Sequence, residues 1–500
     1  MNQQNGQKRR FTEEGIRQEI QQQPHLFAKL AENALTVAES LRNNYFKNTA
    51  QFVKALRLAI HQFEAGERTD PILKIEAVKD ISWSDVKDEV VTFIDGGVGQ
   101  VQISSQIPIL LRVGSYSVKT GERQLAKREE FGYYPIILGD LEGGSKDRKD
   151  FTDIVRITAE LLGGLSALER TPDLKLLMFH GPLVYTVWHY MGHTPFTEKD
   201  IDLFLNQYAE NPQLAQQLKE DFLEEAKIDI YPKMAPDRSD EWIRQRVFEP
   251  LAWMSFLLRE LIKRAKIRSP SPMIVGVVER STIFREFSET ILLERVFQGL
   301  RRKNKEDYFN RIYGWSDLSS PRALLEKLGY TDTLLLAMLL QPGQFSESWV
   351  INKYGGFSRS EISLPGESFF SVANWNCLRP DNTMGFPRVR GLYVHVSDTT
   401  DPLRVEVFDE LATDQHIQDI TQRVYLYARL LPGYGFPVGL DIVDKYAHVP
   451  NWMTDAYSKI IKYQLSSSLQ RGEINDAEMR QILIQAIYMT KRDWLFRPQY

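Results

Sequence analysis

The sequence of 500 residues contains a single cysteine, Cys377. One cysteine excludes an internal disulfide framework and a zinc site built from cysteine ligands. Long hydrophobic runs are also missing, since no segment approaches the ~20 apolar residues that a membrane helix needs. Residues 1–10 are polar and contain no apolar core, so they predict no secretory signal. We therefore expect a cytoplasmic protein without a membrane partner.

The sequence has no excess of positive charge either, and its formal net charge is −4. A nucleic-acid partner would then be held in a local basic groove or delivered by a second protein. The basic runs at residues 263–268 and 301–305 are more typical of solvated helix ends than of binding patches. The hydrophobic content of 43% is that of an ordinary globular protein, here long enough for a large core in two or three layers or lobes.

The chain is organised around residues 89–97, a β-branched and aromatic run that ends on Asp95 and continues into Gly96 and Gly97. Such a run predicts a strand that delivers one carboxylate at its carboxyl end. The two glycines allow backbone or a ligand to approach closely. Hydrolases that hold Mg²⁺ or Mn²⁺ against a phosphate often present their first ligand in this way. The structural alternative is a simple strand-to-turn junction, where Asp-Gly is common.

Two further predicted strands end on polar residues. Residues 174–179 lead into His180 and a glycine, and residues 273–278 lead into Glu279. The helix predicted before the first of them carries Glu160 near the edge of its apolar stripe. Strand, extended hairpin, helix and strand is the order of a ribonuclease H-like core, in which acids from strand ends and one helix converge on metal. We therefore predict an α/β fold with a ribonuclease H-like mixed sheet flanked by helices.

The periodicity of the remaining sequence predicts the other elements. They are a helical hairpin over residues 12–66, strands over 89–95, 101–113, from 116 and over 133–138, a helix from 150, helices within 197–268, a β-hairpin over 391–396 and 403–408, and helices over 415–431, 451–470 and 476–493. Residues 431–448 are assigned to no element.

The chain accordingly divides into three regions. Residues 1–70 form a helical N-terminal segment suited to docking or dimerisation. Residues 71–460 form the catalytic domain, with a helical insertion at about 197–268. Residues 461–500 are C-terminal helices packed on the core.

With these pieces in place, the chain resembles the NurA family of DNA-end-processing nucleases from about residue 89 to about residue 460. The resemblance rests on a set of short motifs in a fixed order: Ile94-Asp95-Gly96, Glu160 upstream of Phe179-His180-Gly181-Pro182-Leu183, Arg404-Val405-Glu406, and the segment from Gly433-Tyr434 to Ala447-His448. It implies a ribonuclease H-like nuclease domain, a homodimer and Mn²⁺-dependent cleavage of DNA. The usual partner is a hexameric HerA-type ATPase that pumps DNA toward the nuclease, in DNA end resection, DNA repair or anti-phage defence.

The resemblance also implies roles for individual residues. Asp95 corresponds to the first metal-binding acid and Glu160 to the helix acid. Tyr434 and His448 correspond to the tyrosine and histidine that complete the pocket, where they would contact the phosphate, assist proton transfer or stack on a base. Lys445 would contact a phosphate of the nucleic acid.

This sequence departs from the family pattern at two positions. His180 stands where the family usually has an aspartate, and Gly97 stands where it usually has a serine. Imidazole ligates Mn²⁺, so Asp95, Glu160 and His180 are the predicted metal ligands. Loss of a carboxylate weakens binding of Mg²⁺ above all, because Mg²⁺ prefers oxygen ligands. Mn²⁺ is therefore the expected cofactor.

Several alternatives stay open at this point. The first is a catalytically weakened or inactive subunit that binds DNA and caps the ATPase ring, and another is a protein–protein scaffold. The spacing of His189 and His193 would also suit a zinc site on a helix, although aromatic neighbours favour packing. Glu279 would be a substitute for the missing acid, and Arg404 and Glu406 are expected to be solvated strand residues.

Overall fold

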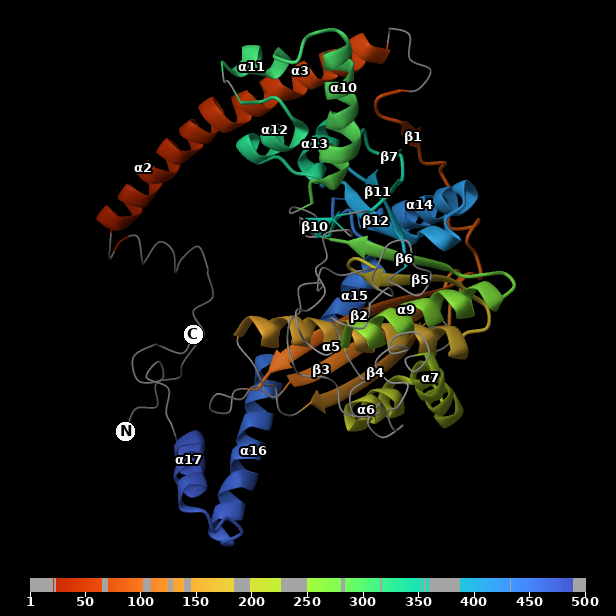
Figure 1. Ribbon diagram of the computed structural model, residues 1–500, viewed down its shortest axis with the longest axis vertical. Coiled ribbons are helices and arrows are strands. Elements are labelled where there is room, and N and C mark those ends of the chain that lie inside the picture. The colour runs from red at the N-terminus through yellow and green to blue at the C-terminus, as the bar shows by residue number, and fades with distance from the viewer. Residues whose placement is uncertain are drawn as a thin grey trace, which may run out of the picture. The chain divides into compact units, whose positions relative to one another are not determined.

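The computed structural model describes residues 21, 24–64, 71–101, 109–124, 129–138, 145–183, 198–225, 250–279, 284–314, 317–351, 353–354, 357–358, 387–431 and 433–488. The chain divides into two compact units. The smaller unit takes in the chain up to Ile72 together with Gln298–Ser319, and the larger unit consists of Leu73–Phe297 and Ser320–Tyr488. Figure 1 labels the elements of both.

The N-terminal helices of the smaller unit follow one another without a loop. Helix α2 (Pro24–Ser40) runs through the π-helical turn η1 (Leu41–Phe46) directly into α3 (Lys47–Glu64), as the red and orange helix of Figure 1 shows. The predicted hairpin is therefore wrong, because no glycine or proline breaks the helix at this junction and a π turn absorbs the change in phase. Helix α3 packs on α11 (Tyr308–Tyr313), where the rings of Phe52 and Phe309 have centroids 5.6 Å apart.

The larger unit is built on a ten-stranded mixed sheet. Its strand order is β1-β7-β11-β12-β6-β5-β2-β3-β4, and β8 pairs with β11 outside this path. Strands β2, β5 and β6 run parallel to one another, whereas the other neighbours are antiparallel. The strands are β1 (Ile75–Ala77), β2 (Val90–Gln100), β3 (Ile109–Lys119), β4 (Glu129–Leu138), β5 (Leu174–His180), β6 (Met273–Val278), β7 (Gln344–Ser346), β8 (Trp349–Val350), β11 (Val389–His395) and β12 (Leu403–Phe408), with β9 (Lys353–Tyr354) and β10 (Phe357–Ser358) forming a separate pair.

Helices cover both faces of this sheet. Because side chains alternate along a strand, Ile94 of β2 contacts Gly163 of α5 (Ser145–Arg170) on one face, and Phe93 contacts Gly439 of α15 (Val438–Ala447) on the other. Helix α9 (Pro250–Ile267) packs beside α5, and α14 (Asp414–Ala428) shares the core of the α15 face. These observations confirm the predicted α/β class with a central mixed sheet flanked by helices.

The remaining helices surround this core or extend from it. They are α6 (Glu198–Tyr208), α7 (Pro212–Glu225), η3 (Ser288–Leu293), α10 (Glu294–Arg302), α12 (Pro321–Leu328), α13 (Asp332–Leu339), η6 (Asp409–Leu411), α16 (Asn451–Gln470) and α17 (Ala477–Tyr488). The first turns of α16 pack through Met453 and Tyr457 against Val101 and Val449. None of the helices in the described part of the chain is long and apolar enough to cross a membrane.

The predicted elements can be compared with the observed ones. Strands β5 and β6 and the hairpin β11–β12 confirm their predictions. Strand β2 does not end at Asp95, because Gly96 and Gly97 stay paired with β3 as far as Gln100; only the parallel pairing with β5 stops, at Ile94. Strand β3 likewise continues through Gly114 without a break. Helix α5 begins at Ser145 rather than at residue 150, and α15 was not predicted.

Candidate metal centre

The carboxyl edge of the parallel strands brings two predicted site residues together. Asp95 lies on β2 just beyond its parallel pairing with β5, and His180 is the last residue of β5. The Nδ1 atom of His180 is 3.0 Å from Oδ2 of Asp95, whose other oxygen accepts the Gly96 N–H at 2.8 Å. Asp95 is 4% exposed. A buried carboxylate and an imidazole thus meet where the parallel pairing of β2 with β5 stops.

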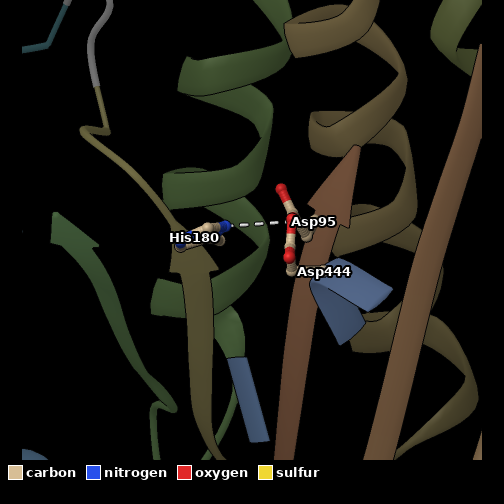
Figure 2. Close-up of side chains that lie close together, drawn as sticks. All are labelled: Asp95, His180 and Asp444. Atoms are coloured by element: carbon tan, nitrogen blue, oxygen red, sulfur yellow. Dashed lines mark hydrogen bonds and ion pairs between the residues drawn. The ribbon is translucent and has the colours of Figure 1, made fainter. Parts of the chain in front are cut away.

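A third potential ligand, Asp444, comes from helix α15 (Figure 2). One ligand atom each from Asp95, His180 and Asp444 lies within 4.8 Å of the other two, and this is the group of potential metal ligands found among the described residues. Two carboxylates and an imidazole suit a first-row divalent metal such as Mn²⁺. The residues therefore fit a divalent cation, and Asp444 supplies a second carboxylate beside Asp95 and His180.

The approach of α15 to β2 depends on Gly97. A Cβ atom on Gly97 would lie 2.0 Å from the carbonyl oxygen of Ala447, so a side chain at this position would push the helix away. Arg112 of β3 holds the end of the same helix by donating from Nη1 to the carbonyl oxygen of His448 at 2.9 Å. Glycine at position 97 thus leaves the room in which α15 brings Asp444 close to Asp95.

The charges of the group affect one another strongly. Burial disfavours the charged form of His180, but the hydrogen bond and charge of Asp95, with Asp444 and Glu279, outweigh it and raise the pKa of His180. Partial burial and the negative charge of Asp95 also raise the pKa of Asp444. Without a cation, protons bound to these side chains reduce the mutual repulsion of the carboxylates. A divalent cation would compete with those protons for the same oxygens and nitrogen.

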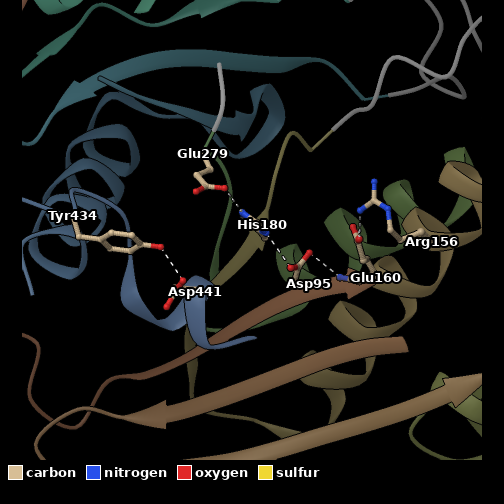
Figure 3. A network of polar contacts seen from close by, with 8 residues as sticks. Asp95, Arg156, Glu160, His180, Glu279, Tyr434 and Asp441 are labelled. Carbon is tan, nitrogen blue, oxygen red and sulfur yellow. Dashed lines mark hydrogen bonds and ion pairs between the residues drawn. The ribbon is translucent and has the colours of Figure 1, made fainter. Parts of the chain in front are cut away.

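Glu160 lies beside this group but is differently engaged. It approaches from α5, the helix on the opposite face of β2, and its carboxylate lies against Gly96 (Figure 3). Arg156, one turn earlier on the same helix, forms an ion pair with it. Burial raises the pKa of Glu160 to about 7, while Arg156 lowers it and Asp95 raises it. Glu160 is therefore within electrostatic reach of Asp95 but lies outside the compact group of three.

The remaining predicted residues lie outside the compact group. The hydroxyl of Tyr434 donates to Oδ1 of Asp441 at 2.8 Å, and Lys445 forms an ion pair with the same carboxylate. The ring of Tyr434 is 40% exposed, and burial together with this hydrogen bond raises its pKa to about 12. His448 follows the last residue of α15 and lies outside the compact group. Oε2 of Glu279 is 3.9 Å from Nε2 of His180.

Aromatic contacts connect Tyr434 with His180 through Phe436. The buried ring of Phe436 meets His180 edge-to-face at 5.4 Å and Tyr434 edge-to-face at 6.4 Å. Phe436 and Asp444 were not among the predicted site residues. Helical spacing was the signal for Asp444, because Leu440, Val443 and Ala447 form one buried stripe and Asp444 flanks it.

Comparison with known protein families assigns the chain. The NurA domain matches residues 89–449. The chain belongs to the NurA family. This match confirms the resemblance found in the sequence. The matched range includes the six predicted site residues Asp95, Glu160, His180, Tyr434, Lys445 and His448.

Solved NurA structures are similar to this chain at low sequence identity. The crystal structure of the NurA nuclease from Sulfolobus solfataricus has a TM-score of 0.45 and 11% identity, covering 89% of this chain and 98% of that one. A NurA structure bound to dAMP and manganese has a TM-score of 0.35 and 10% identity, covering 86% and 94%. At these TM-scores the assignment rests on the family match alone. A comparison with curated proteins finds no match.

One of the remaining sequence hypotheses is tested by the structure, and another falls outside the described residues. Arg404 and Glu406 of the NurA domain are 0% exposed, so the expectation that they are solvated is wrong. Their strand β12 lies inside the sheet, between β11 and β6, and both side chains are enclosed. The zinc hypothesis concerns His189 and His193, which lie outside the described residues, as does Cys377.

Proposed function

We propose that this NurA-family protein is a Mn²⁺-dependent nuclease that hydrolyses phosphodiester bonds at DNA ends. The observation that carries the proposal is the compact group of Asp95, His180 and Asp444 at the carboxyl edge of the parallel strands. Its two carboxylates and one imidazole are ligands that Mn²⁺ accepts, whereas Mg²⁺ prefers oxygen alone. A ribonuclease H-like origin of the sheet is part of this proposal.

The side chains around the group would divide the chemistry among them. When bound, Mn²⁺ would supply Lewis acidity toward the phosphate and lower the pKa of the attacking water. Asp95 and Asp444 contribute the negative charge that holds the cation, and His180 must give up its proton to bind it. Glu160 adds a further carboxylate from the α5 side, within electrostatic reach of Asp95.

The exposed residues Tyr434, Lys445 and His448 would contact the nucleic acid. The half-exposed ring of Tyr434 would orient the phosphate or stack on a base. Lys445, whose side chain is exposed, would contact a phosphate. His448 would assist proton transfer to the leaving oxygen or contact the scissile phosphate.

The wider setting of the activity is proposed from the family resemblance, and the net charge supports one part of it. A chain with a net charge of −4 attracts DNA weakly, so we propose that a hexameric HerA-type ATPase delivers the DNA and stimulates cleavage. The protein would act as a homodimer in the cytoplasm, with residues 1–70 used for docking or dimerisation. The setting would be DNA end resection in repair or anti-phage defence.

A second candidate function has its own observation. Arg156 forms an ion pair with Glu160, and a histidine rather than a third carboxylate completes the compact group, so the negative charge available to hold a cation is limited. A subunit weakened in this way would still bind DNA and cap the ATPase ring.

Cleavage of end-labelled linear DNA in Mn²⁺ tests both functions. We expect the parent protein to cut and Asp95→Ala and Asp444→Asn to lose most activity. Asp455→Asn, an exposed aspartate on α16, is the matched control and should cut like the parent. If only His180→Asp cuts, the natural protein is the weakened subunit. An Asp444→Asn variant as active as the parent would exclude Asp444 from the site.

A further inference from the structure

The buried ion pair of Arg404 and Glu406 is hydrogen-bonded to the backbone that follows His180. Glu406 lies on β12, and its Oε1 accepts a hydrogen bond from Nε of Arg404 at 2.8 Å. Its Oε2 accepts the backbone N–H of Leu183 at 3.0 Å. Leu183 comes three residues after His180, at the end of the turn that leaves β5. One fully buried carboxylate therefore links strand β12 to the segment that carries a proposed metal ligand.

The path of this turn is closely confined. The Gly181 N–H donates to the carbonyl oxygen of Val277 at 2.8 Å, which ties the start of the turn to β6. Gly276 of β6 pairs with Glu406 of β12. A Cβ atom on Gly276 would lie 2.6 Å from the carbonyl oxygen of Gly181 and 3.0 Å from the amide nitrogen of Leu183. Glycine leaves room there for the turn, and the Glu406 side chain holds its far end.

Arg404 in turn is fixed on several sides. Its guanidinium lies over the ring of Phe284, 3.9 Å from the centroid, and interacts electrostatically with Asp332. Asp332 is itself anchored by the N–H groups of Phe287 and Ser288. Replacing a buried ion pair by apolar residues of similar size often leaves stability unchanged or raises it. A contribution to stability is therefore a weak explanation for the Arg404–Glu406 ion pair. The hydrogen bond from the Leu183 N–H to Glu406 points to another role.

We propose that Glu406, held by Arg404, is a positioning residue that fixes His180 in the metal centre through the backbone N–H of Leu183. The inference rests on the proposed function, since it assigns His180 to the metal. A hydrogen bond from an N–H to a carboxylate is charge-assisted and stronger than one to a neutral acceptor. Loss of such an outer partner typically lowers metal affinity about 10- to 100-fold.

Two double variants separate positioning from packing. Arg404→Met with Glu406→Met removes the ion pair and the acceptor for Leu183, whereas Arg404→Met with Glu406→Gln keeps an oxygen for the same N–H. Mn²⁺ affinity is measured by the loss of the free-ion signal in electron paramagnetic resonance, and thermal unfolding without metal reports folding. We expect the Met/Met variant to bind Mn²⁺ about 10- to 100-fold more weakly and the Met/Gln variant to bind like the parent.

A His180→Ala background shows whether the effect passes through His180. There the Met/Met and Met/Gln variants should bind Mn²⁺ equally, because the group that Glu406 positions is gone. Equal affinities of the two variants in the parent background, or a difference that persists without His180, would overturn the proposal.

An independent variant covers a failure to fold. If the Met/Met variant does not fold, Gly276→Ala is used in its place, because the new Cβ would displace the N–H of Leu183. Unchanged Mn²⁺ affinity in Gly276→Ala would overturn the inference. A parent protein that binds no Mn²⁺ would instead refute the proposed function, and the inference with it.

Discussion

Replacing Glu160 by glutamine should stabilise the metal-free protein at neutral and alkaline pH. Burial raises the pKa of Glu160 from 4.5 to about 7, so the folded chain binds this proton more tightly than the unfolded chain. The free energy of unfolding therefore falls as the pH rises from 4.5 to about 7 and then levels off. A shift of this size corresponds to roughly 3 kcal/mol. Glutamine resembles the protonated carboxyl and has no proton to lose in this range, so the variant does not undergo this decrease in the free energy of unfolding.

Urea unfolding in a metal chelator, below pH 4.5 and above about pH 7, measures the effect. The stability of Glu160→Gln relative to the parent should increase by roughly 3 kcal/mol between the two conditions. Glu169→Gln on the same helix is the control, because that side chain is 34% exposed and should show a much smaller change. A difference between Glu160→Gln and the parent that is the same at both pH values would refute the reasoning.

The same pair of proteins tests the contact of Glu160 with metal. A ligand that binds only the folded state raises the free energy of unfolding according to its affinity. If Glu160 joins Asp95 in holding the cation, saturating Mn²⁺ should stabilise the parent more than Glu160→Gln. Equal stabilisation of the two proteins would exclude Glu160 from the ligands.

The other predictions concern the group of three and the approach of α15. His180→Asp should lower the thermal stability of the metal-free protein, because it adds a third carboxylate beside Asp95 and Asp444, and should tighten Mg²⁺ binding in a calorimetric titration. Gly97→Ala should cost about 1–3 kcal/mol in unfolding experiments and weaken Mn²⁺ binding, because the new Cβ would meet the carbonyl of Ala447. Mn²⁺ affinity should rise as the pH increases through the raised pKa of His180, since the imidazole must lose its proton to bind metal. An affinity that does not vary with pH would count against His180 as a ligand.

The parts of the site that lie at strand ends could be predicted, and the parts that depend on packing could not. Asp95 and His180 follow apolar runs, and parallel strands place their carboxyl ends at one edge, so their proximity was foreseeable. The ion pair of Arg156 with Glu160 could also be predicted, because residues four apart on a helix lie side by side. Asp444 was missed because residues 431–448 were assigned to no element.

The sequence by itself determined the central strands, the α/β class and the membership in the NurA family, because periodicity and motif order are properties of contiguous residues. The tertiary structure decided which third side chain faces Asp95 and His180, because that depends on a helix distant in sequence approaching β2 over Gly97. It also decided that Arg404 and Glu406 are enclosed rather than solvated. Alternation along a strand shows which residues share a face, but only the neighbouring strands and loops determine whether water reaches that face.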